Sequence, residues 1–201
     1  MLSGRNAVLH SDPIQIHPEI SPKTRGVILS HLRPFASLPA RKNEASAAFK
    51  AFTIDESEIR RCGHFVPGER SRFVVAQAEA WILLAIFWDN MQSPIHDHDQ
   101  SDCGFRVIAG EVEETRYALV EGDLVRPVAT RLLVANETAK STGESIHRLG
   151  VPTGQSGQSI TLHLYSPILG FDAMGIYRES DDVVVNNDRV ERSMIRSTDD
   201  R

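Results

Sequence analysis

Short apolar and alternating segments, separated by glycine, proline and asparagine, fill the chain from about residue 72 to residue 186. Residues 81–88 are apolar throughout, and Asp89-Asn90 ends the run, which predicts a buried strand. Gly110 separates two further apolar or alternating segments, as expected where two strands meet. Many short strands with glycine-containing turns favour a β-sandwich or β-barrel. The predicted strands are residues 72–79, 81–88, 94–100, 104–109, 112–120, 123–127, 129–135, 159–166 and 171–177.

The N-terminal part of the chain has a different pattern. Five prolines lie between residues 13 and 39, which predicts an arm with short helical turns, such as residues 24–32. Residues 43–61 are rich in helix formers, Asn43 is a candidate N-cap, and Gly63 ends the pattern. We therefore predict an N-terminal arm with helices at 1–68, a β-barrel at 69–186 and a frayed tail at 187–201.

Length, charge and cysteine content narrow the class of protein. A chain of 201 residues is long enough for one domain with a full core. The net charge of −5 gives no basic footprint, so we expect no nucleic-acid partner. No apolar run approaches the roughly 20 residues that span a bilayer, and the N-terminus lacks a signal-like apolar stretch, so we expect no membrane partner. With only Cys62 and Cys103, no disulfide framework is expected. We expect a cytoplasmic, soluble protein, either a monomer or a small homo-oligomer.

The most informative motif is His96-Asp97-His98, which lies in a predicted strand. Side chains in a strand alternate with period 2, so both histidines project from one face. Imidazoles bind iron, copper, nickel or zinc, and His147, in a turn-flanked segment, is a candidate third ligand. Three histidines would leave coordination positions open, as in catalytic sites. A His-x-His pair is also found as an incidental surface pair or as hydrogen-bonded core histidines, and the pair alone does not distinguish these cases.

A second polar group lies on the strand predicted at residues 159–166. Thr161, His163 and Tyr165 share one face of it, and apolar residues share the other. An ordinary half-buried strand would turn this polar face to water. If the face is buried instead, its side chains must be hydrogen-bonded, for example in a relay.

Residues 93–110 contain Ser-Pro-Ile-His-Asp-His, then Cys103, then Gly110. This segment resembles the first cupin motif, with Cys103 in the position of the usual ligand glutamate. Together with Thr-Leu-His-Leu-Tyr-Ser-Pro at residues 161–167, it resembles the cysteine dioxygenase (thiol dioxygenase) family of the cupin superfamily. The resemblance covers roughly residues 70–175. It implies a mainly β fold, the cupin double-stranded β-helix, forming a small β-barrel with an N-terminal helical arm.

The resemblance also assigns residues to roles. It implies one iron(II) ion, Fe(2+), per chain. The family cysteine that becomes linked to an active-site tyrosine matches Cys103, and the tyrosine matches Tyr165. A histidine and a serine that form a hydrogen-bonded chain behind the tyrosine match His163 and Thr161, and threonine keeps the hydroxyl. The family's cis Ser-Pro bond matches Ser166-Pro167. The three iron ligands match His96, His98 and His147.

The resemblance further implies a reaction, in which a small thiol and dioxygen give a sulfinic acid. The arginine that binds the substrate carboxylate best matches Arg72, with Arg70 as the rival, and Arg70 stands where animal members have tyrosine. Cys103 favours L-cysteine as substrate, because many bacterial relatives have glycine there and several of those prefer 3-mercaptopropionate. The alternatives are a 3-mercaptopropionate dioxygenase, a cupin isomerase or hydrolase with another metal, and a non-enzymatic metal-binding cupin.

Overall fold

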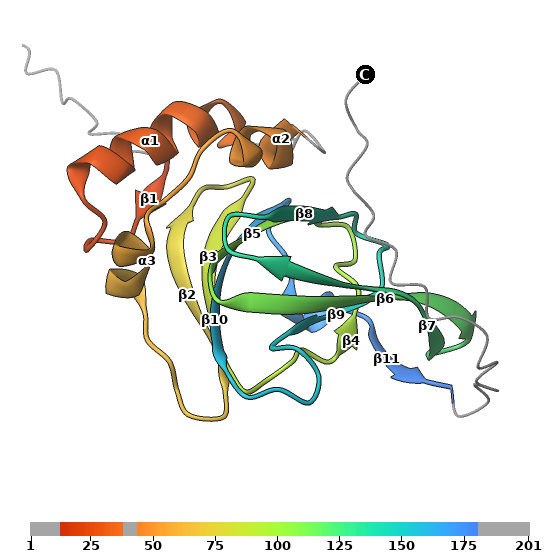
Figure 1. Cartoon of the computed structure of the whole chain (residues 1–201). Helices are drawn as coiled ribbons and strands as arrows, with labels where there is room; N and C mark the ends of the chain where they lie inside the picture. The colour runs from red at the N-terminus through yellow and green to blue at the C-terminus, as the bar shows by residue number, and fades with distance from the viewer. Residues whose placement is uncertain (1–12, 38–43, 181–201) are drawn as a thin grey trace, which may run out of the picture.

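A computed structural model describes residues 13–37 and 44–180, and its core consists of two β-sheets covered on one side by helices (Figure 1). The mainly β fold predicted from the sequence is confirmed. The first sheet has the strand order β1-β2-β3-β10-β5-β8, and the second closes as the ring β11-β4-β9-β6-β7. The strands of the first sheet are β1 (Gln15–Ile16), β2 (Arg70–Gln77), β3 (Ile82–Asp89), β10 (Gln158–Ser166), β5 (Asp102–Ala109) and β8 (Thr138–Ser141). Those of the ring are β11 (Ile176–Glu179), β4 (Ile95–His96), β9 (His147–Gly150), β6 (Glu111–Glu121) and β7 (Leu124–Val134).

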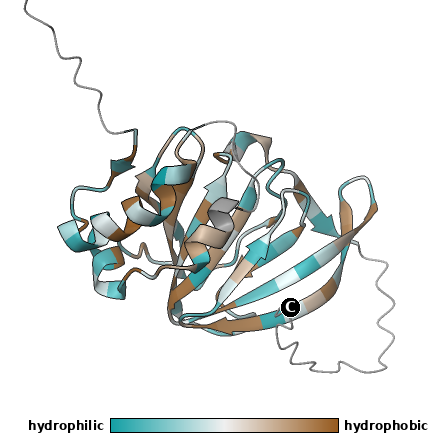
Figure 2. Ribbon diagram, turned by 90° about the horizontal axis from the view of Figure 1, so that it is seen from above, coloured by the Kyte–Doolittle hydropathy of each residue, from teal (hydrophilic) through white to brown (hydrophobic). Residues whose placement is uncertain are grey.

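Strands β3 and β10 form the centre of the first sheet, and both of their faces are buried. Leu83, Ala85 and Phe87 of β3 belong to the same core cluster as apolar residues of the helices, while Ile86 and Trp88 pack in the cluster that includes residues of the ring. The strands beneath the helices are accordingly largely hydrophobic (Figure 2). This two-sided burial explains why residues 81–88 are apolar throughout.

The helices cover the outer face of the first sheet. They are α1 (Pro22–Leu32), α2 (Glu44–Lys50) and α3 (Glu56–Cys62). Ser21 caps α1 by accepting from the Thr24 backbone N–H, and Pro22 starts the helix where its missing donor costs nothing. Arg106 of β5 donates to the carbonyls of Lys50 and Phe52, and so fastens the end of α2 to the sheet.

Several predicted elements differ from the structure. The strand expected at 94–100 is only Ile95–His96, because the chain turns at Asp99, whose φ is 51°, and the His98 N–H donates to the Gly143 carbonyl. Residues 123–127 and 129–135 form one strand, β7, with Pro127 paired at a register shift. Residues 171–177 divide into the 3-10 turn Phe171–Ala173 and the start of β11. The strands β1, β8 and β9 were not predicted; each has two to four residues, too few to show a pattern.

The Asn43 cap and the tail at 187–201 lie outside the described residues, and the division at residue 68 stays a prediction. Within the described ranges, the longest helix has 11 residues, and none is long and apolar enough to cross a membrane.

Candidate metal centre

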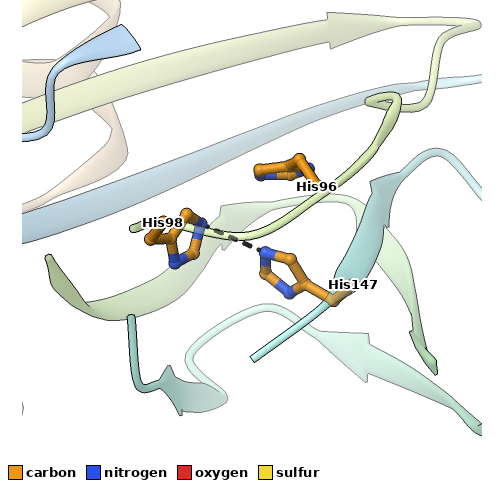
Figure 3. Close-up of side chains that lie close together, drawn as sticks. All are labelled: His96, His98 and His147. Carbon is orange, nitrogen blue, oxygen red and sulfur yellow. Dashed lines mark hydrogen bonds between the residues drawn. The ribbon is translucent and has the colours of Figure 1, made fainter. Parts of the chain in front are cut away.

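His96, His98 and His147 meet inside the second sheet, where all three side chains are buried (Figure 3). His96 ends β4 and pairs in register with His147, the first residue of β9. His98 follows two residues after His96, beyond the end of the strand, and still points to the same place. One ligand atom from each ring lies within 4.8 Å of the others. The structure therefore brings together all three predicted ligands.

Hydrogen bonds at the outer ring nitrogens orient two of these histidines. His96 Nδ1 lies 2.9 Å from the Pro94 carbonyl oxygen, and His147 Nδ1 lies 2.9 Å from Glu114 Oε1. Both partners only accept, so each Nδ1 carries the proton and each Nε2 keeps its lone pair. Nε2 of His147 lies 3.2 Å from Nε2 of His98 (Figure 3). The free lone pair of His147 therefore faces His98, inside the cluster.

Burial sets the charge of this cluster. It lowers the pKa of His96 to about 3 and that of His98 to about 2, with the neighbouring His147 adding to both shifts. These two rings are therefore neutral at physiological pH, which is the form that binds metal. His98 Nδ1 is buried and has no hydrogen-bond partner among the described residues, a cost that folding alone does not explain. Buried imidazoles whose ring nitrogens lie this close together fit a divalent transition metal such as iron(II).

Asp97, between the two histidines, faces away from them and holds their segment in place. Its Oδ1 accepts from the backbone N–H groups of Gly175, at 2.9 Å, and Asp99, at 3.1 Å. Its Oδ2 accepts from the Tyr177 hydroxyl of β11 at 2.6 Å. A Cβ at position 175 would lie 2.6 Å from Asp97 Oδ2, so only glycine permits this contact. Strand β11 thus supports the histidine segment from behind.

The polar face of β10 is buried and turned to the same interior. Tyr165 OH lies 3.4 Å from His163 Nδ1, and His163 Nε2 lies 2.8 Å from Thr161 Oγ1. Trp88 Nε1–H donates to the same Thr161 oxygen at 2.8 Å. The rings of Tyr165 and His98 are 5.4 Å apart, which brings this chain of hydrogen bonds to the histidine cluster. The alternative of a water-facing polar strand is therefore wrong.

Cys103 lies directly across from Tyr165 in the pairing of β5 with β10. Its Sγ is 3.7 Å from His163 Nδ1, the atom that the Tyr165 hydroxyl also approaches. Burial raises the pKa of the Cys103 thiol and, well above its usual value, that of the Tyr165 phenol, so both groups keep their protons. The two partners of the predicted crosslink therefore lie side by side on neighbouring strands.

Arg70 and Arg72 both line a small cavity of about 20 Å³, and the three histidines and Tyr165 line it as well. The Arg70 guanidinium lies over the Trp88 ring, 5.5 Å from its centroid. Burial, with the neighbouring Arg72 charge, lowers the pKa of Arg70 to about 10, so it remains a cation. Arg72 is the more exposed of the two. Both candidate carboxylate-binding residues therefore face the cluster.

Glu114 and Trp88 contact the predicted site residues, but the sequence did not single them out. Glu114 is fully buried; burial favours its neutral form, but hydrogen bonding to His147 and the charges of Arg131 and Arg116 keep its pKa below the usual range. The strand pattern carries a signal for Glu114, because alternation places it on the same face as the core residue Val112 and so predicts that its side chain is buried.

The fold and the three-histidine cluster define a small β-barrel protein with a candidate metal site. A sequence profile of the family described as cysteine dioxygenase type I matches residues 19–180. The chain belongs to this family. It is similar to human cysteine dioxygenase type 1, with 26% identity over 155 residues that cover 74% of this chain and 76% of the human protein. The cysteine dioxygenase type 1 of Pongo abelii gives the same values.

Solved structures of more distant proteins are also similar to this chain. A cupin superfamily protein from Desulfitobacterium hafniense is 13% identical, with a TM-score of 0.42 over 53% of this chain and 84% of that one. The TT1209 protein from Thermus thermophilus is 16% identical, with a TM-score of 0.46 over 57% of this chain and 99% of that one.

Proposed function

We propose that this protein is a non-haem iron(II) thiol dioxygenase that oxidises a small carboxylate-bearing thiol, in the first place L-cysteine, to its sulfinic acid. The observation that carries the proposal is the convergence of three buried histidines, His96, His98 and His147, beside a buried tyrosine. Membership of the cysteine dioxygenase type I family supports the same chemistry. The cytoplasmic location and the monomeric or small oligomeric state stay predictions.

The reaction needs no further reactant. Dioxygen gives both of its atoms to the sulfur, so the thiol RSH becomes RSO2H. The sulfur loses four electrons and dioxygen gains four, and no external reductant takes part. When bound, iron(II) would make deprotonation of the thiol easy and would activate dioxygen.

The remaining side chains would bind and orient the substrate. A substrate carboxylate would accept hydrogen bonds from Arg70 or Arg72, whose planar guanidinium groups suit it. The Tyr165 phenol keeps its proton because burial raises its pKa, and so it can donate a hydrogen bond into the site. The hydrogen bonds that run from Tyr165 through His163 to Thr161 hold that phenol in place.

A second substrate, 3-mercaptopropionate, is favoured by one specific observation. Among the described residues that line the small cavity, none is an aspartate or glutamate that could pair with the ammonium group of cysteine. A thiol with a carboxylate and no amine would leave no unpaired charge there. Cysteine would instead need to enter with its amine neutral.

Oxygen uptake by the iron(II)-loaded protein tests the proposal. The substrates would be L-cysteine, 3-mercaptopropionate, homocysteine and cysteamine, with sulfinate measured in the same samples. Uptake matched by sulfinate with cysteine or 3-mercaptopropionate would support the proposal and identify the substrate. Uptake absent with all four thiols, in protein that retains iron, would contradict it.

Replacing each arginine separately tests the carboxylate site. Arg70→Met or Arg72→Met should raise KM for the carboxylate thiol by about 10-fold to 100-fold, since a charged hydrogen bond contributes about 1.5–3 kcal/mol. The matched control substrate is cysteamine, which lacks the carboxylate. An equal effect on both substrates would exclude that arginine from carboxylate binding.

A further inference from the structure

Glu114 is a fully buried carboxylate that the proposed reaction does not use. It lies on β6, behind the histidine cluster, and does not line the small cavity. Burying a carboxylate is costly unless it is paired and hydrogen-bonded, and an apolar residue of similar size would pack there at lower cost. Its presence at a core-facing position of the strand therefore calls for a role other than packing.

The two oxygens of Glu114 face opposite directions. Oε1 accepts from His147 Nδ1–H at 2.9 Å. Oε2 accepts from Arg131 Nε–H at 2.6 Å, and the Arg116 guanidinium lies 3.7 Å from it. The two arginine side chains are 43% and 45% exposed, respectively, whereas the Glu114 side chain is 0% exposed. One buried charge thus connects a predicted metal ligand to two cations near the surface.

This arrangement has two physical consequences for His147. Accepting from Nδ1–H fixes the tautomer that directs the Nε2 lone pair into the cluster, and it fixes the plane of the ring. The carboxylate also adds a negative charge one hydrogen bond away from a ligand set in which no member is an anion. Arg131 opposes that charge from the other side.

We propose that Glu114 is a positioning residue of the metal centre, which acts through His147, and that Arg131 moderates its charge. The inference rests on the proposed function only in that the three histidines bind a metal. It does not depend on which thiol, if any, is oxidised.

The test compares metal binding in Glu114→Gln with a matched control. Glutamine keeps the size and an acceptor oxygen and removes the charge. The control is Glu113→Gln, the adjacent carboxylate on the other face of β6, which accepts from Thr153 and does not contact a histidine. With Co(II) as the probe, we expect Kd to rise roughly 10-fold to 100-fold in Glu114→Gln and to stay unchanged in Glu113→Gln. Equal Kd values for the two variants would overturn the inference.

The reduction potential of the iron-loaded protein separates positioning from packing. Loss of the Glu114 charge should raise the Fe(III)/Fe(II) potential, and Arg131→Gln should lower it, because the two variants remove charges of opposite sign near one ion. Potentials that stay constant, or that move in the same direction, would overturn the inference. If Glu114→Gln did not fold, the direction of the shift in Arg131→Gln would decide.

These readouts require no thiol turnover. Wild-type protein that binds no metal would contradict both the proposed function and this inference. Wild-type protein that binds metal but oxidises no thiol would contradict the proposed function alone, and the comparison of Glu114→Gln with Glu113→Gln would still decide the role of Glu114.

Discussion

The buried hydroxyl of Thr161 gives a prediction whose size follows from the structure. Thr161 is 0% exposed, and its Oγ1 lies 2.8 Å from both Trp88 Nε1 and His163 Nε2. Trp88 can only donate. His163 Nε2 either donates to this hydroxyl or accepts from it, depending on which ring nitrogen carries the proton. In both cases Thr161 makes two buried hydrogen bonds, and it accepts the one from Trp88.

Replacing Thr161 with valine removes this hydroxyl and leaves the volume almost unchanged. Each buried polar group left without a partner costs about 1–3 kcal/mol, and two are left, so Thr161→Val should lose about 2–6 kcal/mol of unfolding free energy. For a chain of this length that corresponds to a fall in Tm on the order of 10 °C. Thr161→Ser, the matched control, keeps the hydroxyl and loses one methyl group, which costs about 1 kcal/mol.

Catalytic activity should follow the same order as stability, with a larger loss in Thr161→Val than in Thr161→Ser. In Thr161→Val, His163 loses the contact that orients it, so the Tyr165 hydroxyl is held less firmly and kcat should fall. Iron content should stay at the wild-type level, because Thr161 contacts none of the three clustered histidines. Thermal unfolding, metal analysis and oxygen uptake measure the three effects. Equal Tm values for the valine and serine variants would refute the predicted cost of losing the hydroxyl. A wild-type kcat in Thr161→Val would restrict the hydrogen bonds between Thr161, His163 and Tyr165 to a structural role.

Three further predictions concern the metal site and the two cysteines. His147→Ala should fold and lose iron on gel filtration, and wild-type iron content would contradict the ligand assignment. After turnover with iron and dioxygen, intact mass should show a loss of two hydrogens that is absent in Cys103→Ser; the same loss in that variant would exclude a crosslink through Cys103. Burial, with the nearby Glu58 charge, raises the pKa of Cys62 to about 11. In a Cys103→Ser background, alkylation of Cys62 at pH 8 should therefore be at least about 100-fold slower than in urea, and should accelerate as pH rises towards 11. Equal rates in buffer and urea would contradict that burial.

The sequence predicted the elements whose pattern reflects their own burial. Strand β3 is apolar throughout because helices cover one face and the ring covers the other. Strand β10 shows alternation, but alternation alone cannot say whether its polar face meets water or an interior. The structure decides this, because β10 lies between β3 and β5 with its polar face turned towards the ring.

The sequence could not predict features that depend on partners distant in the chain. Strands β8 and β9 have four residues each, and their pairing with β5 and with β4 and β6 specifies them more than their own composition does. Glu114 stands in a run with two other glutamates, and only the register of β6 beside β9 brings it, rather than Glu113, to His147. The meeting of three histidines from two segments likewise depends on the pairing of His96 with His147.

The contact between Asp97 and β11 has a consequence for the order of events during biosynthesis. The histidine segment runs from β4 to the turn at Asp99. Asp97, within it, is held by Gly175 and Tyr177, which follow it by 78 and 80 residues along the chain. A nascent chain that has emerged from the ribosome only as far as β10 contains every histidine of the cluster but lacks that support. We therefore expect the complete histidine site to be held firmly only after β11 has been synthesised and has paired with β4, so metal loading should follow translation of the barrel rather than accompany it.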